Sequence, residues 1–292
     1  MTADDRDELG AHVSAAGGVQ LAPGRAGEID AASMQLFTKQ PNRWAEPEID
    51  DEKAAAWATA RAEHRVRVVV SHDSYLINLA SPDPILWEKS YNSFERELGR
   101  CSVLGVDLMV THPGNSMDSE EASGILRNAE GVTRALEAIP NAPTRVLLEL
   151  TAGSGTSVGG TFEQLAGILD GIPDSLADRV GICFDTCHGY AAGYDLVNEY
   201  DAVWASFNDL IGLDRLALFH LNDSKTPFAS HRDRHEHIGL GSLGDEPFRR
   251  IMTDERFTPV PKVLETPKDD DAVTNDLRNL GRLRAMRSEA GG

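Results

Sequence analysis

Side chains that can bind metal ions recur in this chain at the ends of short apolar segments. His72 ends the sequence Val-Val-Val-Ser-His, and Glu149 lies near the end of Val-Leu-Leu-Glu-Leu. Neutral imidazole and carboxylate groups together suit Zn²⁺, and less specifically Mn²⁺ or Fe²⁺. Six successive segments carry such a residue: His72, His112, Glu149, Asp185, His220 and Glu265.

Two local clusters add further candidate ligands. His188 follows Asp185 by one helical turn, and His235 follows Asp233 by two residues, a spacing that points both side chains to one side of an extended chain. The complete set is too large for one tetrahedral ion and suits two or three ions acting on a phosphate ester. The nine candidate ligands are His72, His112, Glu149, Asp185, His188, His220, Asp233, His235 and Glu265.

Each of these residues also has an ordinary structural interpretation. A single histidine near a strand end is more often hydrogen-bonded within the protein, and a single carboxylate there often caps the next helix. A whole series is harder to explain in this way, because several buried carboxylates need compensating cations. The series therefore favours a metal centre.

The elements that must position these residues alternate regularly along the chain. Short β-rich segments are each followed by a longer amphipathic stretch, and eight such repeats predict a (β/α)8 TIM barrel, an α/β fold. In this fold the carboxyl ends of the strands converge on one face, where active sites are built. An open doubly wound sheet is the alternative. The expected strands are 11–13, 33–37, 66–71, 107–111, 145–150, 180–184, 216–221 and 262–264. The expected helices include 50–63, 84–104, 120–138, 161–169, 196–211 and 246–252.

Length and composition set the organisation. The chain has 292 residues, 41% of them hydrophobic, and no linker or change in composition divides it. We expect a single domain over 1–292, with residues 1–9 disordered and 270–292 forming a helix with a frayed end. No apolar run approaches the roughly 18–20 residues of a membrane span, and the N-terminus is polar and acidic. We therefore expect a cytoplasmic protein without a membrane partner.

The charge and the cysteines exclude some classes of protein. A net charge of −19 argues against a general DNA-coating protein, although an enzyme with a local basic groove remains compatible with it. Acid-rich, lysine-poor composition also suggests a halophilic protein from a high-salt cytoplasm. Cys101, Cys183 and Cys187 form no disulfide framework, and no second cysteine pair completes a sulfur zinc site. We expect them to be reduced, buried thiols.

Two glycine-rich segments look like nucleotide-binding motifs. Residues 239–244 fit G-x-G-x-x-G, but they follow a polar loop rather than an early strand, so a dinucleotide site is disfavoured. Residues 151–160 follow an expected strand but lack the lysine of a phosphate-binding loop. We expect a flexible connection there, whose backbone amides could contact a substrate phosphate.

Eight motifs, in order and over nearly the whole chain, resemble the endonuclease IV family of the xylose isomerase-like TIM barrel superfamily. The match is specific because the motifs include every candidate ligand. They occupy residues 10–18, 71–79, 112–114, 149–153, 185–195, 220–225, 233–235 and 264–266.

The resemblance implies a zinc-dependent apurinic/apyrimidinic endonuclease. The family cuts DNA 5′ to an abasic site, leaves a 3′-hydroxyl and trims blocked 3′ ends, using three Zn²⁺ ions, with Mn²⁺ or Fe²⁺ as alternatives at one site. Hydroxide held between two ions is the nucleophile, and Glu149 is implied to bridge them and to act in catalysis. By the same resemblance, the first ion is held by His72, His112 and Glu149, the second by Glu149, Asp185, His220 and Glu265, and the third by His188, Asp233 and His235.

The resemblance also implies a DNA-binding surface. Tyr75 and Leu76 are similar to the family's wedge into the base stack, although ordinary loop packing explains them equally well. Arg43 stands directly before Trp44, whereas the family's intercalating arginine stands two residues before the tryptophan, in the place held here by Asn42. The candidate phosphate contacts are Lys39, Lys225, Arg232 and Arg234, and Arg43 is a further candidate DNA contact.

Two alternative functions are compared with this interpretation, and two further expectations concern His12 and the oligomeric state. A sugar isomerase or epimerase of the same superfamily would use Glu149, Asp185, His220 and Glu265, but leaves the other ligands unexplained. A non-catalytic binder of damaged DNA is disfavoured by the intact ligand set. His12 has no ligand role in the family and is expected to be structural or to support a ligand. We expect a monomer.

Overall fold

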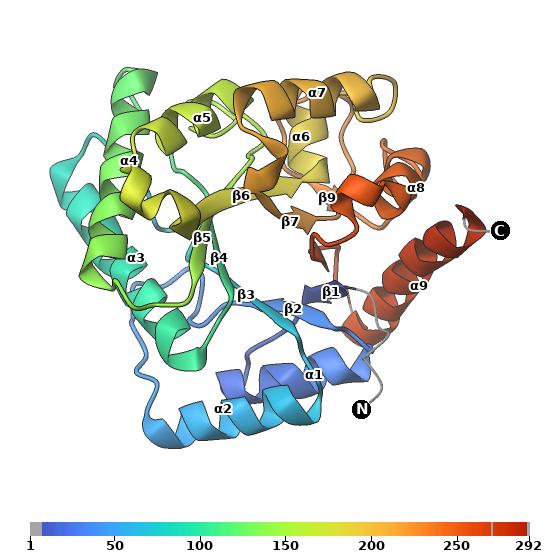
Figure 1. Ribbon diagram of the computed structural model, residues 1–292, viewed down its shortest axis with the longest axis horizontal. Helices are drawn as coiled ribbons and strands as arrows, with labels where there is room; N and C mark the ends of the chain where they lie inside the picture. Colours follow the sequence, from blue (N-terminus) through green and yellow to red (C-terminus); the bar gives the residue numbers. More distant parts are fainter. Residues whose placement is uncertain (1–7, 270, 291–292) are drawn as a thin grey trace.

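Eight parallel strands form a closed barrel in the computed structural model, which describes residues 8–269 and 271–290 (Figure 1). The order around the barrel is β1-β10-β7-β6-β5-β4-β3-β2, so neighbouring strands are consecutive barrel strands in the sequence, except for β1 and β10, whose pairing closes the barrel. Closure excludes the open doubly wound sheet. The strands are β1 (Leu9–His12), β2 (Ser33–Leu36), β3 (Val68–His72), β4 (Leu108–Thr111), β5 (Arg145–Glu149), β6 (Val180–Asp185), β7 (Leu216–His220) and β10 (Lys262–Leu264).

Helices surround the barrel (Figure 1), and their ends follow local sequence signals. In α3 the Asp83 side chain accepts hydrogen bonds from two backbone amides, Pro84 is the first helical residue, and Gly105 ends the helix in the left-handed conformation. The helices are α1 (Ala22–Glu28), α2 (Asp51–Glu63), α3 (Pro84–Leu104), α4 (Glu121–Ala138), α5 (Phe162–Asp170), α6 (Thr186–Ala192), α7 (Tyr200–Leu210), α8 (Glu246–Thr253) and α9 (Ala272–Ala290). None of the helices in the described ranges is long and apolar enough to cross a membrane.

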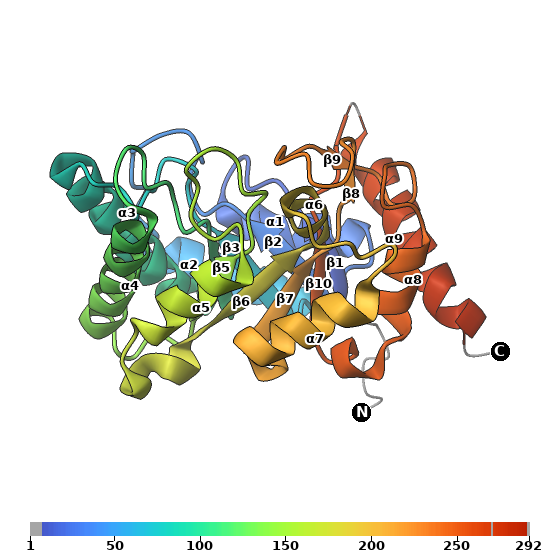
Figure 2. The same cartoon turned by 90° about the horizontal axis from the view of Figure 1, so that it is seen from above.

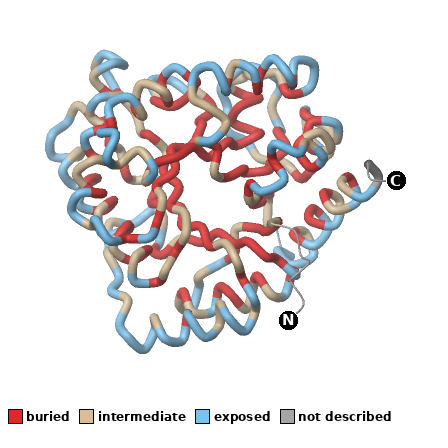
Figure 3. The backbone as a smooth tube through the Cα atoms, in the orientation of Figure 1, coloured by how far each residue is buried: buried red, intermediate tan, exposed pale blue. Residues whose placement is uncertain are grey.

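The core has two parts. A large cluster between the strands and the outer helices includes the fully buried Trp57 and Trp204. A smaller cluster fills the inside of the barrel with one residue from each of six strands: Val70, Val110, Leu147, Cys183, Leu218 and Val263. Figure 3 shows the strands as an almost continuous buried ring. Because side chains alternate along a strand, the residue two positions further on points to the same interior, one layer higher.

The strand and helix boundaries agree closely with those expected from the sequence, with a few differences. Leu9, expected in a disordered terminus, is the buried first residue of β1; residues 1–7 of that segment lie outside the described residues. The sequence did not predict α1, α6 or the antiparallel hairpin β8 (Asp223–Ser224) and β9 (His235–Glu236). That hairpin lies within the long segment 222–245, on the side of the barrel where the strands end (Figure 2).

Candidate metal centre

Strand alternation places six predicted ligands in one layer. Each stands two residues after a member of the inner cluster, so that Val70 is followed by His72 and Leu147 by Glu149. The side chains therefore converge directly above the packed interior, at the carboxyl ends of the strands. The six are His72, His112, Glu149, Asp185, His220 and Glu265.

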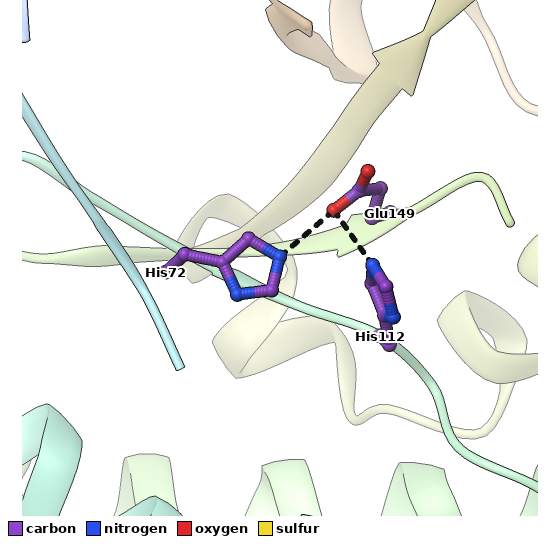
Figure 4. A group of neighbouring side chains, drawn as sticks. All are labelled: His72, His112 and Glu149. Carbon is purple, nitrogen blue, oxygen red and sulfur yellow. Dashed lines mark hydrogen bonds and ion pairs between the residues drawn. The ribbon is translucent and has the colours of Figure 1, made fainter. Parts of the chain in front are cut away.

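Two histidines converge on one oxygen of Glu149 (Figure 4). Nε2 of His72 lies 3.2 Å, and Nε2 of His112 3.3 Å, from Oε2 of the fully buried Glu149. Nδ1 of His72 lies 2.9 Å from the backbone oxygen of Asp73 and can donate to it, which leaves Nε2 free of hydrogen as an electron-pair donor. These three atoms form the first candidate site.

The other oxygen of Glu149 faces a second group. Nδ1 of His220 lies 3.2 Å from Oε1 of Glu149, 3.3 Å from Oε2 of Glu265 and 4.0 Å from Oδ2 of Asp185. The ligand atoms of these four residues lie within 4.8 Å of one another. One carboxylate thus presents one oxygen to each of two candidate sites, which is the arrangement of a bridging ligand.

The third candidate site lies on α6 and the β8–β9 hairpin. Nε2 of His188 is 3.2 Å from Oδ2 of Asp233 and 3.4 Å from Nε2 of His235, which is itself 3.2 Å from Oδ1 of Asp233. Nδ1 of His188 lies 3.0 Å from the backbone oxygen of Leu150, and Nδ1 of His235 lies 3.1 Å from that of Glu265. Both rings can donate there and turn Nε2 toward the site.

These spacings fit zinc. Ligand atoms bound at about 2.0–2.1 Å to one tetrahedral zinc ion lie roughly 3.3–3.4 Å apart. In all three groups the closest ligand atoms are separated by 3.2–3.4 Å. All nine predicted ligands therefore lie in groups that could hold metal ions.

The electrostatics of the protein alone show how strongly the centre depends on positive charge. Burial by itself would lower the pKa of His72, but Glu149 and the other carboxylates outweigh it and raise that pKa to about 10. For His235, Asp185 and Asp233 overcome burial and raise the pKa to about 9. Burial opposes ionisation of Glu149, yet the surrounding histidines hold its pKa well below its usual value. Cations, either protons or metal ions, are needed to balance these carboxylates.

Buried amide side chains hold the ligands in place, and no sequence pattern pointed to them. Nε2 of Gln35 donates to Oε1 of Glu265 (2.5 Å), and Oε1 of Gln35 lies 2.7 Å from Nε2 of His220. Asn222 donates to Oδ2 of Asp185 (2.7 Å) and accepts from the backbone amide of Glu265 (2.8 Å). His12, expected to be structural or to support a ligand, lies beside this group: its Nδ1 is 3.0 Å from Nε2 of Gln35 and 3.7 Å from Oε1 of Glu265.

The three cysteines are buried and not bonded to one another, as the sequence indicated. Two of them nevertheless lie beside the ligands: Cys183 groups with Glu149 and His220, and Cys187 groups with Asp185 and His235. Burial raises the pKa of both thiols to about 12, so they stay protonated near neutral pH.

Both glycine-rich segments are hydrogen-bonded to other parts of the protein. In the segment 239–244 the amides of Gly241 and Leu243 donate to the carboxylate of the buried Asp223, both at 2.9 Å. The segment 151–160 connects β5 to α5, and Ser154 donates to the backbone oxygen of His231. The first segment is therefore a loop anchored on the β8–β9 hairpin.

Residues expected to contact DNA occupy different surroundings. Tyr75 is 54% exposed, yet its ring lies 5.3 Å from that of His72 and 5.9 Å from that of His112. Leu76 beside it is half-buried, whereas Arg43 and Asn42 are exposed. The aromatic side chain thus lies at the rim of the metal centre. A wedge into the base stack of a bound duplex would need this position.

Lys39 is the exception. Its ammonium group is buried, 2.6 Å from Oε1 of Glu46 and 2.8 Å from Oγ of Ser93, and its side chain is only 2% exposed. The prediction that Lys39 contacts phosphate is incompatible with this burial, because its charge is neutralised within the protein. Lys225, Arg232 and Arg234 are exposed in the 222–245 segment and remain candidates.

A pocket of about 310 Å³ opens beside the first and third sites. Tyr75, His112, His188 and Asp233 contribute to its walls, together with the start of the 151–160 segment. Within the described ranges, the buried hydroxyls of Thr151 and Ser157 in these walls have no hydrogen-bond partner. The pocket therefore gives solvent access to ligands of the first and third candidate sites.

Comparison with known proteins agrees with this geometry. The model of the xylose isomerase-like TIM barrel family matches residues 24–286. A probable endonuclease 4 of Geobacter sulfurreducens is 46% identical over 282 residues, 96% of this chain and 94% of the relative. A probable endonuclease 4 of Halorhodospira halophila is 46% identical over 277 residues, 92% of this chain and 91% of the relative.

The chain belongs to the endonuclease IV family.

The comparison with solved structures agrees with this family membership. The crystal structure of endonuclease IV from Thermus thermophilus has a TM-score of 0.84 and 34% sequence identity, covering 96% of this chain and 99% of that one. A D-tagatose 3-epimerase-like protein has a TM-score of 0.69 at 15% identity, covering 97% of this chain and 100% of the other. At that identity the second likeness concerns the fold alone.

Proposed function

We propose that this protein is a DNA-repair endonuclease that hydrolyses the phosphodiester bond 5′ to abasic sites, leaves a 3′-hydroxyl and trims blocked 3′ ends. The observation that carries the proposal is the shared carboxylate of Glu149, whose two oxygens face two adjacent ligand groups. Paired ions bridged in this way are suited to displacement at phosphorus. The family relationship supplies the substrate class, double-stranded DNA.

The cofactor proposed is three Zn²⁺ ions, with Mn²⁺ or Fe²⁺ as alternatives at one site. His72, His112 and Glu149 would hold the first, Glu149, Asp185, His220 and Glu265 the second, and His188, Asp233 and His235 the third. When bound, the ions supply hydroxide at neutral pH and neutralise the charge that develops on the phosphate oxygens.

The protein's own groups contribute orientation and shape. The backbone oxygens of Asp73, Leu150 and Glu265 fix the rings of three histidines with Nε2 toward the centre. Tyr75 with Leu76 would fill the gap in the base stack at the lesion. Arg43, Lys225, Arg232 and Arg234 are the proposed contacts to the DNA backbone.

Cleavage of a labelled duplex with one abasic site, together with a count of bound metal, tests the proposal. We expect a single cut 5′ to the lesion and about three zinc ions per chain. A duplex of the same sequence without the lesion is the matched control and should remain intact. Absence of cutting by the zinc-loaded protein, or one or two ions with activity on a sugar, would favour an isomerase or epimerase instead.

A further inference from the structure

One buried side chain of the C-terminal helix α9 is hydrogen-bonded to the two segments that carry the candidate ligands His235 and Glu265. Asn279, 1% exposed, accepts a hydrogen bond from the backbone amide of Ile238 at 3.2 Å. Its Nδ2 donates to Oγ1 of Thr266 and to Nδ1 of His237, both at 3.0 Å. Both donors and one acceptor lone pair of the amide are therefore used, and all three partners belong to segments outside α9.

Those partners lie one to three residues after two candidate metal ligands. His237 and Ile238 stand two and three residues after His235, and Thr266 follows Glu265. The two segments also meet at the ligands themselves, since Nδ1 of His235 lies 3.1 Å from the backbone oxygen of Glu265. A closed circuit thus runs from His235 through Glu265 and Thr266 to Asn279 and back along the β9 segment.

The circuit matters because it fixes the part of the hairpin next to His235; farther along the hairpin, the backbone amides of Ala229 and His231 donate to the backbone oxygens of Tyr190 and Ala191 on α6. Strand β9 has two residues and pairs only with β8, so its own ladder is short. Figure 2 shows this hairpin projecting beyond the end of the barrel. The imidazole of His235 must nevertheless hold its Nε2 within a few tenths of an ångström to complete a metal site.

We propose that Asn279 is a positioning residue that fixes His235 relative to Glu265 and thereby maintains the third metal site. The inference rests on the proposed function for its third ion. It does not depend on that function for its geometry, which concerns only the protein's own hydrogen bonds. Asn279 contacts neither an ion nor the substrate.

Three variants separate this role from general helix docking. Asn279→Leu keeps the branching of the side chain, at a larger volume, and removes all three hydrogen bonds. Asn279→Asp keeps them, since the amide of Ile238 still donates and the Thr266 hydroxyl and the His237 ring can reverse to donors. Arg282→Ala removes a different tie between α9 and the loop, the pair with Asp245 at 2.7 Å, and leaves the three hydrogen bonds of Asn279 in place.

We expect Asn279→Leu to lose one zinc ion of three, or to bind it about 10–100-fold more weakly, while retaining the other two. Asn279→Asp and Arg282→Ala should keep all three. Histidine ¹⁵N NMR should show altered His235 signals in Asn279→Leu alone, with metal present or removed.

Two results would overturn the inference: full zinc content with unchanged His235 signals in Asn279→Leu, or an equal loss of the third ion in Arg282→Ala. The proposed function fails separately. If the wild-type protein holds fewer than three ions while Asn279→Leu still alters the His235 signals, the metal count is wrong and the positioning role stands.

Discussion

Glu149 is the residue on which the proposed metal centre depends most. It is fully buried, it faces two ligand groups with different oxygens, and nitrogens of four histidines lie 3.1–3.3 Å from its carboxylate. A neutral amide at this position could offer an oxygen to only one group.

We therefore predict that Glu149→Gln lowers the rate of abasic-site cleavage on the order of a thousandfold or more. The loss of a shared ligand removes several kcal/mol of charge stabilisation, and each 1.36 kcal/mol corresponds to a factor of ten. Single-turnover kinetics on protein of measured metal content provide the test. Glu130→Gln, the same change on an exposed side chain of α4, is the control. Near-normal cleavage by the Glu149 variant would exclude the bridging role.

Removal of the metal should also expose a pH dependence. In the protein alone, neighbouring carboxylates overcome burial and raise the pKa of His72 to about 10 and that of His235 to about 9, from 6.5. Because the folded-state values exceed the unfolded value, the protonated rings stabilise the fold fully below about pH 6.5. That stability is lost as the pH rises through 9 to 10.

Denaturant titration of the chelated protein should thus show an unfolding free energy that falls from neutral pH to pH 10. The zinc-loaded protein should lack this component, since its ligand rings are already deprotonated. A metal-free protein whose stability is constant over that range would show that these histidines are not coupled to the carboxylates.

How far the site could be predicted depends on the kind of residue. The six ligands of the strand ends are visible in the sequence because each follows an apolar run at the spacing of strand alternation. Gln35 and Asn222 are not visible, because an amide has no periodic signature and Gln35 meets His220 across 185 residues of chain. The burial of Lys39 escaped prediction for the same reason: its partner Ser93 lies on α3.

At the scale of elements, a buried ionic network joins the β2–α2 connection to α3. Glu97, fully buried, accepts hydrogen bonds from Thr38, Ser71 and Arg100. Arg100 also donates to Glu46, the partner of Lys39. The network fixes the segment 38–46, which carries the exposed Asn42 and Arg43.

Arg100→Met should therefore destabilise the protein by roughly 3–5 kcal/mol, the cost of leaving buried carboxylates without their partner. The measurement is chemical unfolding of the zinc-loaded protein. Lys53→Met, which breaks an exposed pair with Asp50, is the matched control and should have a much smaller effect. Equal effects of the two substitutions would mean that the network contributes no more than a surface pair.

Predicting the elements themselves succeeded where length and amphipathic periodicity were sufficient. Helix α3 begins and ends at the expected residues because Asp83, Pro84 and Gly105 mark both ends. Helices α1 and α6 have seven residues each and were not predicted, since two turns carry little periodicity. Hairpin β8–β9 depends on contacts with α6 and α9 rather than on its own sequence, which is why 222–245 reads as a loop.

The whole molecule carries a charge of −19, which opposes the approach of DNA everywhere except at a local groove. Salt weakens phosphate contacts, but it also screens this repulsion. We predict that abasic-site cleavage persists, or is even greatest, at roughly molar salt, where the Debye length is about 3 Å. Apolar wedging by Tyr75 and Leu76, which salt does not weaken, would then carry more of the specific binding.

A salt series of cleavage rates, with folding followed by circular dichroism in the same samples, provides the measurement. A steep, monotonic decline from low salt by a protein that remains folded would refute both the halophilic interpretation and the importance of the wedge. Tyr75→Ala should lose more activity at high salt than Lys225→Ala, which removes a proposed phosphate contact.

The pairing of β10 with both β1 and β7 has a consequence for biosynthesis. Every other strand of the barrel precedes residues 262–264, so the nascent chain holds two unpaired strand edges until these residues have left the ribosome. Glu265 follows directly on that strand, and Asn279 comes later still. A product terminated before β10 and Glu265 can have neither a closed barrel nor a complete ligand set. The proposed metal centre is thus acquired only after all the other strands have been synthesised.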